Sequence, residues 1–180
     1  ETFSPTPHTC MLKILLAIAV QYGLDLRQMD VHTAFLIPDL PEEEVIFMRP
    51  PPDLLSLLEE CGIFLKKGES LRLLKCIYGL KQAGRIWYSS MSKGLMKLGF
   101  QRSPSDTCLF TMIDEENNDA IVITTWVDDC IVSYNNEKTW KRMLEKICDK
   151  FTLGAGVVVN GDENLLDIIV SNEGQTNKIY

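Results

Sequence analysis

The chain has 180 residues, of which 46% are hydrophobic, and this is enough for one domain with a buried core. Lys13 interrupts the longest apolar stretch, which falls short of the roughly 18 residues of a membrane-spanning helix, so we expect no membrane segment. The formal net charge of −7 would argue against nucleic-acid binding if the charge were spread evenly along the chain.

The first predicted element is a helix over residues 10–22. Thr9 can cap this helix, and Gly23 ends it. Its apolar residues occur almost all round the helix, which predicts that it is buried on every side. Strands are then predicted over residues 26–33, 45–48 and 71–77, the first of them running into residues 34–36. Residues 54–67 are ambiguous, and a helix followed by a loop is one interpretation of them.

The second half of the chain alternates between helical and strand patterns. Helices are predicted over residues 82–98, with Trp87, Met91, Leu95 and Leu98 on one stripe, and over residues 137–151, with Trp140, Leu144, Ile147 and Phe151 inward. Strands are predicted over residues 107–113, 120–126 and 130–134, with an acidic loop at 114–119 and weak strands at 166–170 and 178–180. The order predicts an α+β fold in one domain, residues 1–180, with helices on one face of an antiparallel sheet.

The charge is distributed unevenly. The segment from Gly62 to Arg102 carries nine basic residues and one acid, Glu69, a net charge of +8, so the remainder of the chain carries −15. The nine are Lys66, Lys67, Arg72, Lys75, Lys81, Arg85, Lys93, Lys97 and Arg102. A basic segment in an acidic chain is typical of a phosphate-facing surface. It is equally typical of the solvated face of an amphipathic helix, and charge alone favours neither interpretation.

The cysteines and histidines argue against a disulfide framework and a zinc site. None of the six cysteines forms a C-x-x-C pair, and the chain has no N-x-S/T site. We therefore expect reduced thiols, mostly in the core, in an intracellular protein. The two histidines, His8 and His32, are too few and too scattered to bind zinc. The chain begins with Glu1 rather than Met, which we interpret as a piece of a longer protein.

Two adjacent acids, Asp128 and Asp129, stand between the apolar strands predicted at 120–126 and 130–134. This pattern predicts a hairpin with the acids at its turn. Adjacent carboxylates repel each other, and burying one without a partner is costly. A solvated surface turn is one interpretation, because Asp is common in turns. A pocket for a divalent cation is the other, and it needs a third carboxylate from elsewhere in the chain.

Asp30 is the candidate for that third carboxylate. It is a lone acid in an otherwise apolar part of a predicted strand, between Met29 and Val31, where it needs a partner, a metal or a hydrogen-bond network. Mg²⁺ prefers one or two protein carboxylates together with phosphates and water. Two such ions roughly 3.5–4 Å apart can activate an attacking hydroxyl and stabilise a leaving pyrophosphate. From the residues alone, this site remains one hypothesis among several.

Three stretches extend this pattern: residues 28–36 (QMDVHTAFL), residues 78–88 (YGLKQAGRIWY) and residues 126–129 (WVDD). In this order and spacing they resemble the reverse transcriptase of copia-type LTR retrotransposon Pol polyproteins. The similarity runs along nearly the whole chain, including ETFSP at its start. It implies an α+β polymerase palm with partial fingers. It also implies an RNA-directed DNA polymerase that transfers dNMP from a dNTP to a primer 3′-hydroxyl.

The resemblance also implies roles for individual residues. It assigns catalysis to Asp30, Asp128 and Asp129, which with the carbonyl of Val31 would hold two Mg²⁺ ions, for which Mn²⁺ can substitute. Phe35 would pack under the incoming sugar and exclude a 2′-hydroxyl. The remaining residues implied at the nucleotide are Ala34, Gln82, Lys81 and Arg85. For Lys81 and Arg85 a solvated helix face remains the alternative.

The implied partners are an RNA template, a DNA primer, a dNTP, and the integrase and ribonuclease H segments of the same polyprotein. The implied location is intracellular, in a cytoplasmic virus-like particle, with a nuclear phase possible. The family normally has a basic fingers segment before ETFSP and a thumb and ribonuclease H after the palm. We therefore expect this fragment alone to be inactive.

The sequence departs from the family pattern at three places. Trp126 stands where Tyr is usual, and Gly84 replaces a usual proline and would loosen the turn into the following helix. Residues 165–167 read LLD where the family shows F-L-G, a segment expected to contact the primer. This last change favours the alternative function, a decayed or non-catalytic retroelement relic that folds and binds RNA or protein.

Overall fold

The computed structural model describes residues 3–66, 68–151 and 157–160, the last four by their backbone alone. Its helices are α1 (Thr9–Tyr22), α2 (Pro52–Glu60), α3 (Ala83–Lys97) and α4 (Glu137–Phe151), with a short 3₁₀ helix η1 (Ala34–Leu36). Its strands are β1 (Asp25–Val31), β2 (Phe47–Met48), β3 (Leu71–Arg72), β4 (Gln101–Arg102), β5 (Leu109–Asp114), β6 (Asp119–Trp126), β7 (Asp129–Tyr134) and β8 (Val157–Asn160). The predicted α+β class is confirmed.

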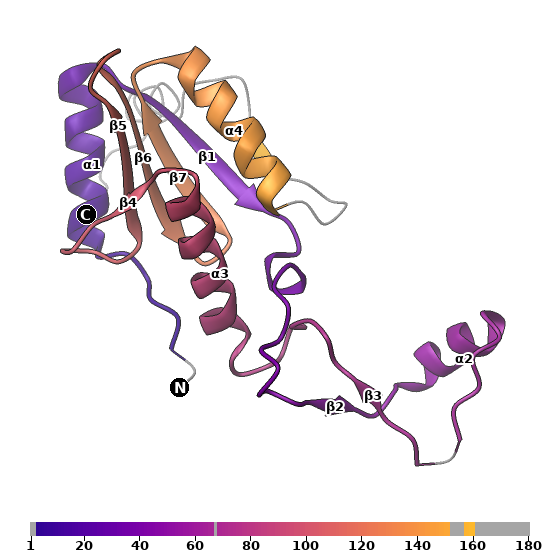
Figure 1. Ribbon diagram of the computed structural model, residues 1–180. Helices are drawn as coiled ribbons and strands as arrows, with labels where there is room; N and C mark the ends of the chain where they lie inside the picture. Colours follow the sequence, from indigo (N-terminus) through magenta and orange to yellow (C-terminus); the bar gives the residue numbers. More distant parts are fainter. Residues whose placement is uncertain (1–2, 67, 152–156, 161–180) are drawn as a thin grey trace, which may run out of the picture.

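Six of these strands form one sheet in the order β4-β5-β6-β7-β1-β8 (Figure 1), and all of its pairings are antiparallel. Strands β5, β6 and β7 follow one another through short turns. Strand β1 comes from much earlier in the chain and pairs with β7 from Asp25 opposite Tyr134 to Asp30 opposite Asp129. This pairing brings the predicted strand acid to the predicted acidic turn.

Helices α3 and α4 cover one face of the sheet (Figure 1) and form the main core with it. The predicted stripe of α3 is confirmed, because Trp87, Met91 and Leu95 are buried and Leu98 packs against them. On α4 the inward residues Trp140, Ile147 and Phe151 are buried, with Met143 beside them and Leu144 partly buried. The alternating residues of β1, β6 and β7 supply the other side of this core.

Helix α1 lies on the opposite face of the sheet (Figure 1), so the prediction that all helices share one face is wrong. The prediction that this helix is buried on every side is also wrong. Only Leu15 and Ala19 are buried, whereas Ile14, Val20 and Tyr22 are at least half exposed. The sheet covers one flank of an apolar helix, and the described residues supply no second layer on the other flank. The helix ends at Gly23 in the left-handed region, as predicted.

The start of α1 also differs from the prediction. His8, not Thr9, is the residue that precedes the first helical turn, and neither its side chain nor that of Thr9 caps the helix. The backbone N–H of His8 instead donates to the carboxylate of Asp106, at 2.8 Å. Asp106 is buried and also accepts from the N–H of Cys108. The side chain of Asp106, which precedes β5, therefore holds the segment before α1 in place through this hydrogen bond.

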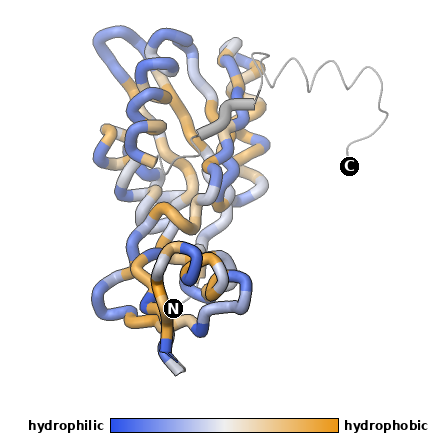
Figure 2. The backbone as a smooth tube through the Cα atoms, turned by 90° about the vertical axis from the view of Figure 1, so that its right-hand side faces the viewer, coloured by the Kyte–Doolittle hydropathy of each residue, from blue (hydrophilic) through white to orange (hydrophobic). Residues whose placement is uncertain are grey.

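A smaller part of the molecule, formed by α2, β2 and β3, extends away from the sheet (Figure 1). Figure 2 shows hydrophobic segments in this part as well as along the sheet strands. Here the predicted strands are too long: β2 and β3 have two residues each, and residues 34–36 turn into η1 instead of continuing β1. The ambiguous segment 54–67 overlaps α2, which begins two residues earlier, at Pro52, and has no buried residue.

Strands β4 and β8 lie where no strand was predicted, and the weak strands predicted at 166–170 and 178–180 lie outside the described residues. All six cysteines are free thiols, as predicted. Only Cys76, Cys108 and Cys130 are buried, so the prediction of mostly core cysteines holds for half of them. None of the described helices has the length and apolar character needed to cross a membrane.

Candidate active site

The predicted hairpin turn connects β6 to β7 and carries the two adjacent acids. Trp126 and Asp129 pair across the turn, so only Val127 and Asp128 lie between the strands. Val127 has φ of +60°, in the left-handed region, whereas positive φ at the first central position of such a turn is normally taken by glycine. The backbone at this turn is therefore strained, and strained residues cluster at functional sites.

The strand acid reaches the same place through the β1–β7 register. Asp30 stands directly opposite Asp129, and the N–H of Val31 donates to the carbonyl of Asp128, at 3.0 Å. Because side chains alternate along a strand, Asp30 and Asp129 project from the same face, opposite the one that carries α3 and α4. The structure thus brings together four predicted site residues, Asp30, Val31, Asp128 and Asp129.

Electrostatics at this place disfavour the charged form of Asp30. Its pKa is raised, first by burial and then by the negative charge of Asp128, with a smaller contribution from Asp129. His32 opposes these effects through a contact of 3.2 Å between its Nε2 and Oδ2 of Asp30. Like charges directly opposite each other destabilise an antiparallel sheet. The fold therefore holds an unfavourable carboxylate pair, which protonation of Asp30 or a bound cation would relieve.

The chemistry of this donor set fits a hard divalent cation, because carboxylate and carbonyl oxygens are the ligands that Mg²⁺ prefers. The side chains do not yet form a closed cage. Among the described residues, no group of three or more His, Cys, Asp or Glu side chains is arranged to hold a metal ion. Asp129 instead accepts a hydrogen bond from Gln28, at 3.4 Å, and Asp30 contacts His32. A cation would draw these carboxylates away from their present partners.

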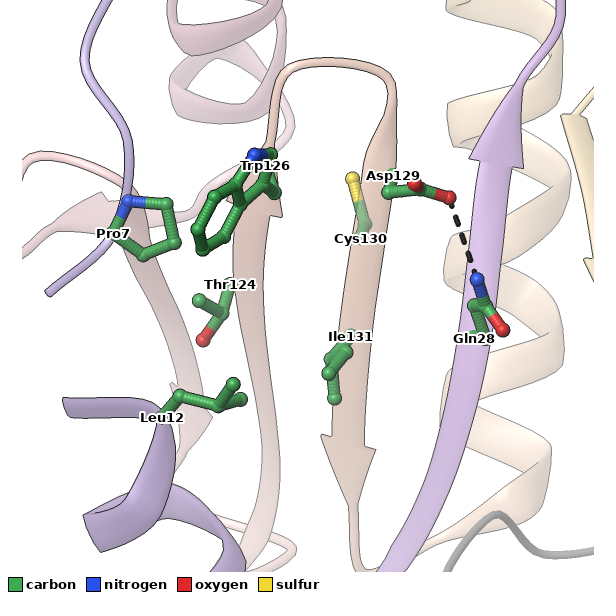
Figure 3. Close-up of a pocket in the computed structure, with 8 residues that line it drawn as sticks. All are labelled: Pro7, Leu12, Gln28, Thr124, Trp126, Asp129, Cys130 and Ile131. Atoms are coloured by element: carbon green, nitrogen blue, oxygen red, sulfur yellow. Dashed lines mark hydrogen bonds between the residues drawn. The ribbon is translucent and has the colours of Figure 1, made fainter. Parts of the chain in front are cut away.

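A cavity of about 390 Å³ opens beside Asp129 on the α1 side of the sheet (Figure 3). Pro7 and Leu12 line it from the N-terminal segment and α1, and Gln28 and Asp129 line it from β1 and β7. Trp126, which is half exposed, covers its upper end in the view of Figure 3. The indole at the position where the family usually has Tyr therefore borders open space next to the acids.

The residues predicted to contact the nucleotide differ from one another in burial and in their contacts. Phe35, on η1 just beyond β1, is partly buried and packs against Tyr78, with ring centroids 5.0 Å apart. Ala34 is buried in the core, so its side chain contacts protein. Gln82 precedes the first turn of α3 without capping it through its side chain. Lys81 is exposed.

Arg85 is engaged elsewhere in the structure. Its guanidinium forms a short charge-assisted hydrogen bond with Glu44, so it is not directed freely toward a triphosphate. Lys75, another member of the basic segment, contacts Asp39 at 3.2 Å and donates to the carbonyl of Ile37. The basic segment is therefore not a uniform free surface, because two of its cations join neighbouring loops.

Three contacts at the site were not predicted from the sequence. Gln28 lies two residues before Asp30 on the same face of β1, and strand alternation alone would have identified it. The contact of His32 with Asp30 depends on the side-chain conformation beyond the end of the strand. The indole N–H of Trp87 donates to the carbonyl of Val127, at 2.7 Å, from a helix far away in the sequence. Helical periodicity identified Trp87 only as a core residue.

Gly84 has a packing reason in the structure. A Cβ added at this position would lie 3.1 Å from the Cβ of Ser4 in the N-terminal segment. The glycine therefore allows the chain before α1 to pass close to the start of α3. The departure at residues 165–167 lies outside the described residues.

Comparison with known proteins gives the same family as the motifs. Residues 1–176 match the family described as reverse transcriptase (RNA-dependent DNA polymerase). The retrovirus-related Pol polyprotein from transposon RE2 of Arabidopsis thaliana is 34% identical over 153 residues, which are 85% of this chain and 10% of that protein.

Two further relatives come from a second plant and from yeast. The retrovirus-related Pol polyprotein from transposon TNT 1-94 of Nicotiana tabacum is 35% identical over 73% of this chain and 9% of its own length. The transposon Ty1-BL Gag-Pol polyprotein of Saccharomyces cerevisiae is 30% identical over 80% of this chain and 7% of its own length. The chain thus spans about a tenth of the length of the curated relatives that it matches. No solved structure gives a significant match. The chain belongs to the reverse transcriptase (RNA-dependent DNA polymerase) family, in its copia-type Pol polyprotein branch.

Proposed function

We propose that the chain is the palm, with part of the fingers, of an RNA-directed DNA polymerase that extends a primer by two-metal catalysis. The observation that carries this proposal is the register of β1 and β7, which sets Asp30 directly opposite Asp129 and beside the turn residue Asp128. A sheet gains nothing in stability from this arrangement of like charges. The family gives the arrangement a purpose, because its members are polymerases.

Each residue has a task in this mechanism. Asp30, Asp128 and Asp129, with the carbonyl of Val31, would hold two Mg²⁺ ions. Bound divalent cations would activate the primer 3′-hydroxyl and stabilise the charge on the leaving group. A bond then forms between the primer oxygen and the α-phosphorus of the dNTP, the bond to the β-phosphate oxygen breaks, and pyrophosphate leaves. Catalysis rests on positioning and electrostatics.

The nucleotide would lie between the acids and the start of α3. Phe35 follows β1 by four residues and packs against the cluster of Cys76, Ala83 and Ile86 that includes the first turn of α3. The aromatic ring, supported by this cluster, would pack beneath the sugar of a nucleotide bound at Asp30. Gln82 and Lys81 would contact the base and phosphates, and RNA template and DNA primer would bind across the exposed face of the acids.

A thermal-shift titration with Mn²⁺ or Mg²⁺ tests the metal site. Cation at ten times its Kd would stabilise the chain by about 1.4 kcal/mol, and Asp128→Asn should remove most of this shift. Asp149→Asn is the matched control, because it removes one exposed acid from α4 and should leave the shift unchanged. Equal shifts in the wild type and in Asp128→Asn would refute a shared cation site at the turn.

A decayed relic that binds RNA or protein remains the second candidate, because Asp167 stands where the family shows a glycine. Asp167→Gly in a longer chain of the polyprotein separates the two. A large gain in primer extension by this variant would identify the natural chain as decayed, whereas equal extension by both chains would support the enzyme.

A further inference from the structure

The strained turn between β6 and β7 requires interactions that maintain its backbone conformation. Val127 is β-branched and has φ of +60°, a conformation that such a residue rarely adopts. Strain of this kind persists only where the surrounding structure enforces it. The two following residues, Asp128 and Asp129, take their directions from this turn. Relaxation of Val127 would therefore move both acids relative to Asp30.

The side chain of Val127 packs against the core, and a hydrogen bond from the core reaches its backbone. The indole Nε1–H of Trp87 donates to the carbonyl oxygen of Val127, at 2.7 Å. Trp87 is completely buried and comes from the first half of α3. Its N–H is the only hydrogen-bond donor of the side chain, and it is directed at the backbone of the turn.

The ring of Trp87 is itself held in place. Phe151, the last residue of α4, meets it edge-on, with centroids 5.8 Å apart and planes at 72°. Phe151 fits there because α3 has Gly94 at the facing position: a Cβ on Gly94 would lie 2.5 Å from the tip of the Phe151 ring. The donor is therefore fixed by contacts with both helices of the core. On the other side of the turn, the N–H of Val31 donates to the carbonyl of Asp128.

We propose that Trp87 is a positioning residue for the catalytic turn, whose indole N–H holds Val127 in its strained conformation and thereby sets the directions of Asp128 and Asp129 toward Asp30. This inference rests on the proposed function, which gives those acids their task. It assigns to Trp87 more than core filling, because the ring fills the core against which Val127 packs, whereas the N–H bonds to the backbone of the turn.

The test removes the N–H while keeping the ring. Trp87→Phe is the simple variant, and site-specific replacement of Trp87 by benzothienylalanine, which has sulfur in place of the N–H, keeps the shape of the indole. Trp140→Phe is the matched control, because Trp140 is equally buried in the same core but stacks on Tyr134 at the far end of β7.

Two measurements, hydrogen exchange and Mn²⁺ binding, report on the conformation of the turn independently of overall stability. Amide hydrogen exchange at Val31 reports directly on its bond to Asp128. We expect both Trp87 variants to raise this exchange on the order of fivefold, the effect of losing one hydrogen bond in a partly buried place, and Trp140→Phe to leave it unchanged. Mn²⁺ titration should show weaker binding for the Trp87 variants alone. Val31 exchange in the benzothienylalanine protein that matches the wild type would overturn the proposal.

A double-mutant cycle tests the link to strain. Val127→Gly allows positive φ without cost, so removing the N–H should raise Val31 exchange less in the Val127→Gly background than in the natural one. Equal effects in both backgrounds would show that Trp87 does not act through the strain at Val127. If the natural chain binds no Mn²⁺ at its acids, the proposed metal site fails, but the exchange measurements still decide whether Trp87 positions the turn.

Discussion

At Asp30, the function that we propose and the stability of the fold make opposite demands on one residue. Its carboxylate stands opposite Asp129, its pKa is raised by burial and by Asp128, and it contacts the half-exposed His32, a contact that is ionic only when the imidazole is protonated. An exposed or half-exposed ion pair contributes little to stability. The residue therefore weakens the fold in its charged form, which is expected of a group retained for its chemistry.

The first prediction concerns this carboxylate and pH. Because the pKa of Asp30 is raised in the folded chain, its contribution to stability is fully present below the unfolded pKa and is lost as pH rises through the folded pKa. Asp30→Asn should therefore stabilise the metal-free chain at neutral pH by about 0.2–1 kcal/mol. This advantage should shrink as pH falls below the folded pKa of Asp30.

Urea unfolding of the two proteins at neutral and at acid pH measures both effects. Asp149→Asn serves as the control for a general change in net charge, and it should show no comparable gain. A loss of stability in Asp30→Asn at neutral pH would mean that the carboxylate is satisfied in the fold and would remove the argument from like charges.

The second prediction concerns Phe35 and sugar selection. Phe35→Val in an active longer chain should open space beneath the sugar and lower the preference for dNTP over rNTP on the order of 10–200-fold, the range for a change in hydrophobic pocket size. Phe35→Tyr keeps the bulk and should keep the preference. Single-nucleotide incorporation with matched dNTP and rNTP measures the ratio. An unchanged ratio in Phe35→Val would assign the ring to core packing against Tyr78 alone.

Elements were predictable from the sequence where periodicity and burial agree. The inward stripes of α3 and α4 and the hairpin β6–β7 follow from patterns that a single buried face imposes. Helix α1 shows where such reasoning stops. An apolar pattern tells which residues can be buried, but the layers that cover them come from the tertiary structure. Contacts between distant residues, such as that of Arg85 with Glu44, likewise depend on the tertiary arrangement of the loops and could not be predicted from local sequence patterns.

The third prediction tests how α1 is fastened. The buried carboxylate of Asp106 accepts from the backbone N–H groups of His8 and Cys108, so Asp106→Ala leaves both donors without this partner. We expect a loss of about 1–3 kcal/mol in the free energy of unfolding. Ser105→Ala changes the exposed neighbour and should have little effect. Chemical denaturation followed by circular dichroism measures both variants. Equal stabilities of Asp106→Ala and the wild type would show that this carboxylate does not stabilise the fold through the N-terminal segment.

At the scale of the whole molecule, the acids lie on an open face. Asp30 and Asp129 project from the sheet toward the side of α1. The part formed by α2, β2 and β3 stands away from the sheet (Figure 1). In-line attack needs reacting atoms held near 3–3.5 Å, and loose positioning by one ångström can cost about a hundredfold. Attraction of nucleic acid by the basic segment is salt-sensitive and does not align a primer end. We therefore predict that these 180 residues alone bind nucleic acid weakly and extend no primer.

Primer extension on a poly(rA) template with Mg²⁺ tests the central claim, that Asp30, Asp128 and Asp129 are the catalytic acids of a polymerase palm. The measurement compares these 180 residues with a longer Pol chain that contains them, each with and without Asp128→Asn. We predict extension by the longer chain only. Asp128→Asn should reduce it by at least about a hundredfold, because even residues behind metal ligands typically cost 10–100-fold. Extension by the longer chain that survives Asp128→Asn unchanged would contradict the assignment of the acids.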